Sequence, residues 1–131
     1  MWLLKTEPGT YSYEDLEREG RTTWDGVANP VAQRNLRAMK AGDRAFVYHT
    51  GDERAVVGRA KVVKAAYPAR PGDRLVVVDL EAAGRLPRPV TLERIKQLAV
   101  FADSPLVRQG RLSVVPLTAE QVSAIESGGE A

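Results

Sequence analysis

The sequence predicts an α+β domain in which a mixed, mostly antiparallel sheet or small β-barrel is flanked by helices. Several runs of residues alternate between apolar and polar with the two-residue period of strands, among them 55–65 and 74–82. Capping residues such as Asn29 and Thr118 open helical segments. Strands and helices do not alternate as β–α–β units, which favours the mixed arrangement over a parallel sheet.

The N-terminal region is predicted to hold a strand and a short helix. Residues 1–6 form the strand, and a Pro-Gly turn follows it. Ser12 caps the helix, Asp15 stands three residues later as its reciprocal partner, and Gly20 closes the helix. Residues 22–27 show no periodicity, so we expect them to form a loop.

A second helix is predicted to start at Asn29, because Asn is a good N-cap and Pro30 suits the first helical position. Gly42 and Asp43 end this helix. Three apolar residues share one face and four polar residues lie elsewhere on the helix: Ala32, Leu36 and Met39 against Gln33, Arg34, Arg37 and Lys40.

Three further strands are predicted in the middle of the chain, at residues 44–50, 55–65 and 74–82. Residues 67–73 form a loop because they hold two prolines and one glycine, and Pro87 and Pro89 are expected to break the chain after the last of these strands.

The C-terminal region is predicted to hold two helices and one strand. A short helix starts at Thr91 and runs through Leu98, and residues 112–117 form the last strand. Thr118 caps the final helix, with Gln121 as its reciprocal partner.

Composition is that of one globular domain, which we expect to span residues 1–131. Of the 131 residues, 44% are apolar and 27% are charged, an ordinary balance. The chain has no Cys, which excludes disulfides, thiolate nucleophiles and Cys-based metal sites. The sequence shows no membrane-length apolar run and no signal peptide, so we expect a cytoplasmic protein that does not bind membranes.

Positive charge is concentrated in the middle of the chain. The formal net charge is +2, but residues 30–75 carry ten basic groups against four acidic ones, a local net charge of +6. Gathered on one face, these groups would form a footprint for nucleic-acid phosphates. The alternative is an ordinary solvated surface.

The usual enzyme signatures are weak or absent. We find no phosphate-binding Gly-rich loop, no dinucleotide fingerprint and no nucleophile elbow. The single histidine, His49, cannot build a His-rich metal site. We therefore expect no metal, no cofactor and no catalytic residues.

Three segments stand out instead, and each has a purely structural alternative. Residues 4–8 are a strand end that enters a turn, residues 24–29 carry a tryptophan that can serve as a core anchor, and residues 46–51 can be a buried strand with a satisfied histidine. The functional interpretation joins the three, because an aromatic wall with a few hydrogen-bonding groups suits an extruded nucleic-acid base. In that case Trp24 stacks on the base.

The residues in these segments resemble those of a known family, the EVE domains. The opening WLLKTEP is similar to the family's first strand, with Thr6 in place of Ser. The run WDGVANPVAQRNLRAMKAGDRAFVYHTG is similar to its signature of Trp-Asp-Gly-Val, an Asn, a helix and then Tyr-His-Ser/Thr, and the later segments LPRPVTLERIK and GRLSVVPL are similar too. The resemblance covers residues 1–125.

The resemblance implies a PUA-like fold, a small mixed β-barrel with flanking helices that is similar to YTH domains. It implies a non-enzymatic module that reads a modified cytosine or adenine in DNA or RNA, and we expect it to act as a monomer. The base-binding residues implied are Lys5, Thr6, Trp24, Asn29, Tyr48, His49 and Thr50. We expect Arg34, Arg37 and Lys40 to hold the nucleic-acid backbone. The Tyr and Arg that many members carry after the Asn are absent here, which leaves the contacts of those two residues in doubt.

Two alternatives remain open at this point. Some PUA-like relatives, the ASCH group, include hydrolases of acylated nucleosides with Lys, Thr and Glu in the pocket, and Lys5, Thr6 and Glu7 are residues of these types. Neighbouring residues on a strand face opposite sides, however, so Thr6 is expected to point away from the other two. The second alternative is a plain interaction domain in which Trp24 and His49 belong to the core.

Overall fold

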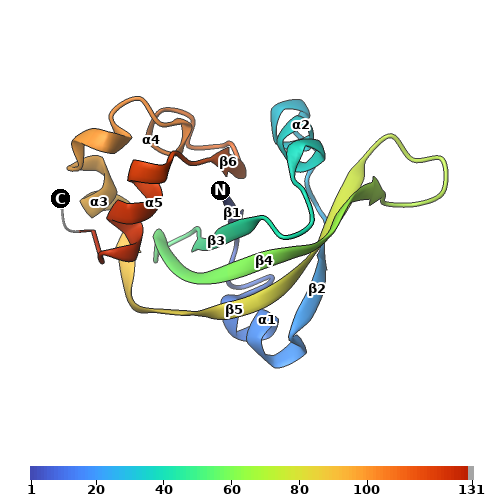
Figure 1. The fold of residues 1–131 in the computed structure, drawn as a ribbon, viewed down its shortest axis with the longest axis horizontal. Coiled ribbons are helices and arrows are strands. Elements are labelled where there is room, and N and C mark those ends of the chain that lie inside the picture. Colours follow the sequence, from blue (N-terminus) through green and yellow to red (C-terminus); the bar gives the residue numbers. More distant parts are fainter. Residues whose placement is uncertain (130–131) are drawn as a thin grey trace.

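The computed structural model describes residues 1–129 as a curved mixed sheet with short helices around it (Figure 1). The strands are β1 (Trp2–Thr6), β2 (Arg21–Trp24), β3 (Arg44–His49), β4 (Ala55–Pro68), β5 (Val76–Thr91) and β6 (Val114–Pro116). The helices are α1 (Tyr13–Glu19), α2 (Pro30–Ala38), α3 (Leu92–Lys96), the 3₁₀-helix η1 (Ala99–Phe101), α4 (Pro105–Arg108) and α5 (Ala119–Glu126).

The six strands lie in the order β2-β5-β4-β3-β1-β6. Strand β1 pairs with β3 in parallel, and the other recorded pairs are antiparallel. This confirms the predicted α+β class and the mixed, mostly antiparallel sheet. Strands β2 and β6 form the two edges, and among residues 1–129 there is no pairing between them that would close the sheet into a barrel.

Several predicted boundaries are confirmed by the hydrogen bonds that create them. Both capping boxes form, one between Ser12 and Asp15 and one between Thr118 and Gln121. Asn29 caps α2 through its side-chain oxygen, which accepts from the backbone N–H groups of residues 31 and 32.

The predicted loop at residues 22–27 is wrong in its first half. Residues 21–24 form β2, which pairs with residues 78–81 of β5, and the Thr23 hydroxyl donates to Asp79 at 2.9 Å. A four-residue edge strand is too short to show periodicity, so only its distant partner identifies it.

The predicted break at Pro87 and Pro89 is also wrong, because both lie inside the sixteen-residue strand β5. The recorded pairing with β4 skips from Arg85 to Val90, and β2 flanks β5 only at residues 78–81. Neither proline therefore has to supply a ladder hydrogen bond, which is the condition under which a strand tolerates proline.

One side chain of α2 departs from the predicted helix faces. Gln33, expected among the polar residues away from the apolar face, is only 2% exposed. Its amide donates to the backbone oxygens of Val27 (2.7 Å) and Val76 (3.0 Å), and its oxygen accepts from the Val76 N–H at 2.8 Å. Gln33 thus fastens α2 both to the segment after β2 and to the start of β5.

Strands β4 and β5 form a long hairpin whose tip, residues 69–75, projects away from the body (Figure 1). Four register shifts interrupt their pairing and let the two strands curve. Helix α1 lies below the sheet in this view and α2 above it, and β2 runs between the two helices in the sequence.

Candidate functional site

A cavity of about 490 Å³ opens between the end of β1, the turn that follows it and the β2 segment. This volume is in the usual range for small-molecule sites. We call it the Trp24 pocket, and its lining residues are Lys5, Thr6, Glu7, Thr10, Tyr11, Glu19, Thr22, Thr23, Trp24, Asp25, Gly26, Val27 and Ser113.

Trp24 and Tyr11 supply the aromatic wall of the pocket. Their ring centroids lie 6.1 Å apart and their planes are nearly perpendicular, at 87°. Trp24 is 6% exposed, so most of its surface packs against the core while the remainder borders the cavity. The Tyr11 hydroxyl donates to the Glu19 carboxylate, and burial together with this carboxylate raises the pKa of Tyr11. The ring of Tyr11 is thereby held in place.

Lys5 places a partly desolvated ammonium group beside the cavity. Its Nζ donates to the backbone oxygen of Gly110 at 2.9 Å and lies 5.6 Å from the centroid of the Tyr48 ring. Burial lowers the pKa of Lys5. One of the three ammonium protons is engaged with Gly110, which leaves others for a ligand.

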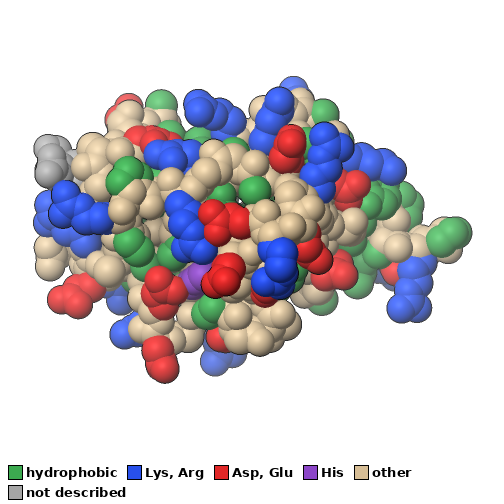
Figure 2. All heavy atoms as spheres, turned by 90° about the horizontal axis from the view of Figure 1, so that it is seen from below, with side chains coloured by type: hydrophobic (Ala, Val, Ile, Leu, Met, Phe, Trp, Pro, Cys, Tyr) green, Lys and Arg blue, Asp and Glu red, His purple; other side chains and the backbone are tan. Residues whose placement is uncertain are grey.

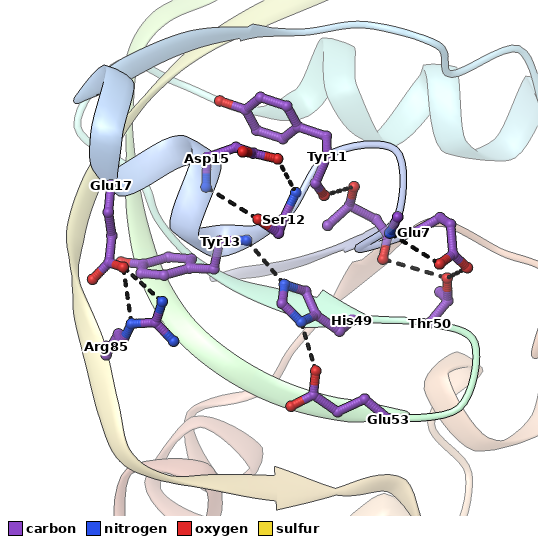
Figure 3. Close-up of polar contacts among 12 residues, drawn as sticks. Glu7, Tyr11, Ser12, Tyr13, Asp15, Glu17, His49, Thr50, Glu53 and Arg85 are labelled. Atoms are coloured by element: carbon purple, nitrogen blue, oxygen red, sulfur yellow. Dashed lines mark hydrogen bonds and ion pairs between the residues drawn. The ribbon is translucent and has the colours of Figure 1, made fainter.

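Thr6 and Glu7 complete the β1 side of the pocket, and both side chains have internal partners. Figure 3 shows Glu7 next to Thr50. The Thr6 hydroxyl donates to the Tyr11 backbone oxygen at 2.6 Å. The Glu7 carboxylate accepts from the Gly9 N–H and from the Thr50 hydroxyl, each at 3.2 Å. These bonds shape the turn that brings Tyr11 back towards β1.

The structure brings Lys5, Thr6 and Trp24 to one cavity but places four other predicted site residues outside its lining. Asn29 caps α2, and Tyr48 is 3% exposed beneath Lys5. Thr50 supports the pocket from behind, because it bonds to the backbone oxygen of Thr6 and to Glu7.

His49, the fourth of these residues, lies in a different contact network. Its Nε2 accepts the Tyr13 backbone N–H at 2.9 Å, and its Nδ1 lies 2.7 Å from the Glu53 carboxylate (Figure 3). An acceptor at Nε2 assigns the imidazole proton to Nδ1, where it donates to Glu53. On the face shown in Figure 2 acidic side chains lie on either side of the histidine, and a basic side chain lies above it. His49 thus fastens the start of α1 to β3.

The predicted backbone-binding residues Arg34, Arg37 and Lys40 are exposed on or just after α2. Arg37 donates to the backbone oxygen of Arg74 at 2.6 Å, which links α2 to the tip of the β4–β5 hairpin.

The sequence identified only Lys5, Thr6 and Trp24 as site residues among those that line the pocket, so it missed the other lining residues, Tyr11 and Asp25 among them. It also missed Gln33, which does not border the pocket but bonds to the backbone oxygen of the lining residue Val27. Tyr11 reaches the cavity through the turn after β1, in which its N–H donates to the Glu7 oxygen at 2.9 Å. Asp25 belongs to the Trp-Asp-Gly motif. Its position directly after Trp24 was the feature of the sequence that could have identified it as a pocket residue. Nothing local distinguishes Gln33 from its exposed neighbours.

Within residues 1–129 no group of three or more His, Asp or Glu side chains is arranged to hold a metal ion. No helix in this part of the chain has the length and apolar character needed to cross a membrane.

Comparisons with known proteins agree with this architecture. The model of the EVE domain family matches residues 1–128. Thymocyte nuclear protein 1 of Rattus norvegicus is 34% identical over an alignment that covers 99% of this chain and 74% of the rat protein. Protein Atu2648 of Agrobacterium tumefaciens has a solved structure with a TM-score of 0.93 at 36% identity, covering 98% of this chain and 91% of that one.

Two further structures bear on the ligand and the fold. The human THYN1 protein, solved in complex with 5-methylcytosine-containing DNA, has a TM-score of 0.85 at 31% identity, with 99% of this chain and 97% of that chain covered. A mutant ASCH protein of Zymomonas mobilis has a TM-score of 0.61 at 13% identity over 96% of each chain, a likeness of fold alone.

Proposed function

The chain belongs to the EVE domain family, and on this premise we propose that it is a non-enzymatic nucleic-acid-binding module that holds a modified base in the Trp24 pocket. The observation that carries the proposal is the cavity itself. Its wall contains an indole, and the polar residues Lys5 and Thr6 border the same space. An extruded base needs this combination of an apolar face and hydrogen-bonding groups.

Stacking on Trp24 would supply the sequence-independent part of the binding energy. Each base–aromatic stack contributes about 1–3 kcal/mol. Tyr11 holds its ring nearly perpendicular to that of Trp24, so it borders the base at its edge rather than stacking on it. Lys5 would contact the base edge. The exposed residues Arg34, Arg37 and Lys40 would contact the phosphates.

The DNA complex of the human relative supports DNA carrying a modified cytosine as the first ligand to test. The proposal also includes modified adenine and RNA as possible ligands. It further includes the PUA-like barrel, action as a monomer, absence of a cofactor and a cytoplasmic location. The base-reading residues of the proposal include Asn29, Tyr48, His49 and Thr50, which in this structure would act by supporting the pocket.

Fluorescence titration of a Trp2→Phe variant tests the proposal, because this variant leaves Trp24 as the single indole. Oligonucleotides that contain 5-methylcytosine are expected to change the emission saturably and to bind more tightly than matched strands with cytosine. A flat signal with modified cytosines and adenines in both DNA and RNA, at low salt, would overturn the proposal.

A pair of substitutions separates stacking from simple loss of stability. Trp24→Phe keeps an aromatic face and is expected to bind within a few-fold of the parent, whereas Trp24→Leu should weaken binding by about fivefold to a hundredfold through loss of the stack. Phe101→Leu is the matched control, since Phe101 is fully buried in η1 and does not border the pocket. It should lower stability without lowering the affinity of the folded protein.

One observation favours a second candidate function, hydrolysis of an acylated nucleoside. Lys5, Thr6 and Glu7 all border the cavity, and the lowered pKa of Lys5 is the kind of shift that activates an amine. The three side chains nevertheless bond to other residues and not to one another. Lys5 bonds to Gly110, Thr6 bonds to Tyr11, and Glu7 bonds to Gly9 and Thr50. Turnover of acylated cytidine that disappears in Lys5→Ala would establish the hydrolase, and its absence would leave the binding module.

A further inference from the structure

We propose that Asp25 makes the Trp24 pocket selective for bases that carry an exocyclic amino group, namely derivatives of cytosine and adenine, over uracil and thymine. This inference rests on the proposed function and specifies which chemical feature of the base is read. It follows from an inventory of the carboxylates around the cavity.

Three carboxylates border the pocket, those of Glu7, Glu19 and Asp25. Two of them are engaged within the protein. Glu7 accepts from the Gly9 N–H and the Thr50 hydroxyl, and Glu19 accepts from the Tyr11 hydroxyl. These bonds hold the wall of the pocket together and already occupy part of the acceptor capacity of both carboxylates.

The carboxylate of Asp25 is free for a ligand. It has no hydrogen-bond or salt-bridge partner within residues 1–129, and the residue is exposed. Asp25 directly follows Trp24, the residue on which the base would stack, and both border the cavity. A base stacked on the indole therefore presents its edge near this acceptor.

A free carboxylate distinguishes bases by whether the group that faces it donates or accepts a hydrogen bond. The amino groups of cytosine (N4) and adenine (N6) are donors, and carboxylates are established partners of the cytosine N4 amino group. Uracil and thymine carry a carbonyl oxygen, O4, in the place of the cytosine amino group. Two acceptors would then face each other, so the hydrogen bond that an amino group donates to the carboxylate is lost.

Lys5 provides the complementary donor from another strand, β1, that lines the same cavity. Its ammonium group has spare protons beyond the one given to Gly110. In cytosine and adenine the amino donor adjoins a ring nitrogen that accepts. Thymine held in the same position presents the reverse pattern, the acceptor O4 beside the N3–H donor. An acceptor from the end of β2 and a donor from the end of β1 therefore match the amino-bearing base better.

Four single-stranded DNA oligonucleotides that differ at one position test the inference: cytosine, 5-methylcytosine, uracil and thymine. The set varies the methyl group and the amino group independently, and single strands remove differences in base-pairing energy. We expect 5-methylcytosine to bind at least about fivefold more tightly than thymine. In Asp25→Asn, whose amide can also donate to O4, this ratio should fall towards one because thymine binding improves.

Asp52→Asn is the matched control, because Asp52 is exposed, carries the same charge and does not border the pocket. It corrects for the general gain in DNA affinity when a negative charge is removed, and it should keep the wild-type ratio. Asp25 is exposed, so its substitution by Asn is expected to leave folding unchanged.

The outcomes separate the two levels of the proposal. Binding that depends on Trp24 but is equal for 5-methylcytosine and thymine, or a preference that Asp25→Asn leaves intact, overturns the role of Asp25 and leaves the base-binding module standing. Absence of any Trp24-dependent binding to the four strands and to the wider panel overturns both.

Discussion

The ring of Tyr13 lies directly against Gly58, so that a Cβ on this glycine would stand 2.4 Å from the ring carbons. Tyr13 cannot easily move away. Its hydroxyl donates to the Arg59 backbone oxygen at 2.6 Å and accepts from the Gly84 N–H at 3.0 Å. The first residue of α1 is thus packed into the bend of the β4–β5 hairpin, and the turn before it carries Tyr11 into the Trp24 pocket.

Gly58→Ala should therefore destabilise the protein by about 1–3 kcal/mol, the usual cost of overpacking a filled core. Urea unfolding followed by circular dichroism measures the change. Gly110→Ala is the control, because a Cβ there meets no atom within 4 Å, and it should stay within about 0.5 kcal/mol of the parent. Equal stability of the two variants would show that the close packing of Tyr13 is not rigid.

Gln33 joins one wall of the pocket to the first residue of β5, next to the tip of the hairpin, through Val27 and Val76. Gln33→Ala leaves buried backbone groups without partners, at a cost of about 1–3 kcal/mol. Hydrogen exchange at the Val76 amide should become faster, and binding of a modified base should weaken. Gln109→Ala, at an exposed residue after α4, should change neither. Unaltered exchange at Val76 would contradict the positioning role of Gln33.

Acid should weaken the tie between α5 and the sheet. Arg59 Nε donates to Glu126 Oε1 at 2.9 Å, and this bond lowers the pKa of Glu126 below its ordinary value of 4.5. A carboxyl with a lowered pKa in the folded state stabilises the fold above its unfolded pKa, and this contribution is lost as pH falls through the folded pKa.

Glu126→Gln should accordingly be less stable than the parent at neutral pH, and the two should converge as pH falls below 4.5 and through the lowered folded-state pKa of Glu126. Unfolding midpoints in urea across this pH range measure the effect. Glu120→Gln, at an exposed residue in the first turn of α5, should follow the parent at every pH. A constant gap between Glu126→Gln and the parent would mean that the ion pair does not titrate in this window.

The basic side chains of α2 should set the salt dependence of binding. If Arg34, Arg37 and Lys40 contact phosphates, replacing each by Gln should reduce the slope of log K against log salt by about 0.7–0.9 per residue. Preference for the modified base should persist. Lys96→Gln, in α3 at the opposite end of the molecule (Figure 1), should leave the slope unchanged. An unchanged slope in the α2 variants would place the phosphates elsewhere.

Helix starts that depend on residues close together in the sequence were predicted correctly. The two capping boxes and the Asn29-Pro30 helix start act within three or four residues, so their signals lie in the sequence itself. The edge strand β2 and the prolines inside β5 were predicted wrongly because the secondary structure of these residues depends on which strand lies beside them. The residues of β2 pair with residues that lie 54 to 60 positions later in the chain, and such distant partners leave no trace in a local window.

The sequence by itself determined the α+β class, the helix starts and the family, and it named Lys5, Thr6 and Trp24, which do border one cavity. Only the tertiary structure decided that Tyr11 and Asp25 share this cavity while His49 serves α1. The physical reason is that a pocket forms where separate chain segments converge. Its membership depends on side-chain direction and on hydrogen bonds across the sheet, and neither is encoded within a single segment.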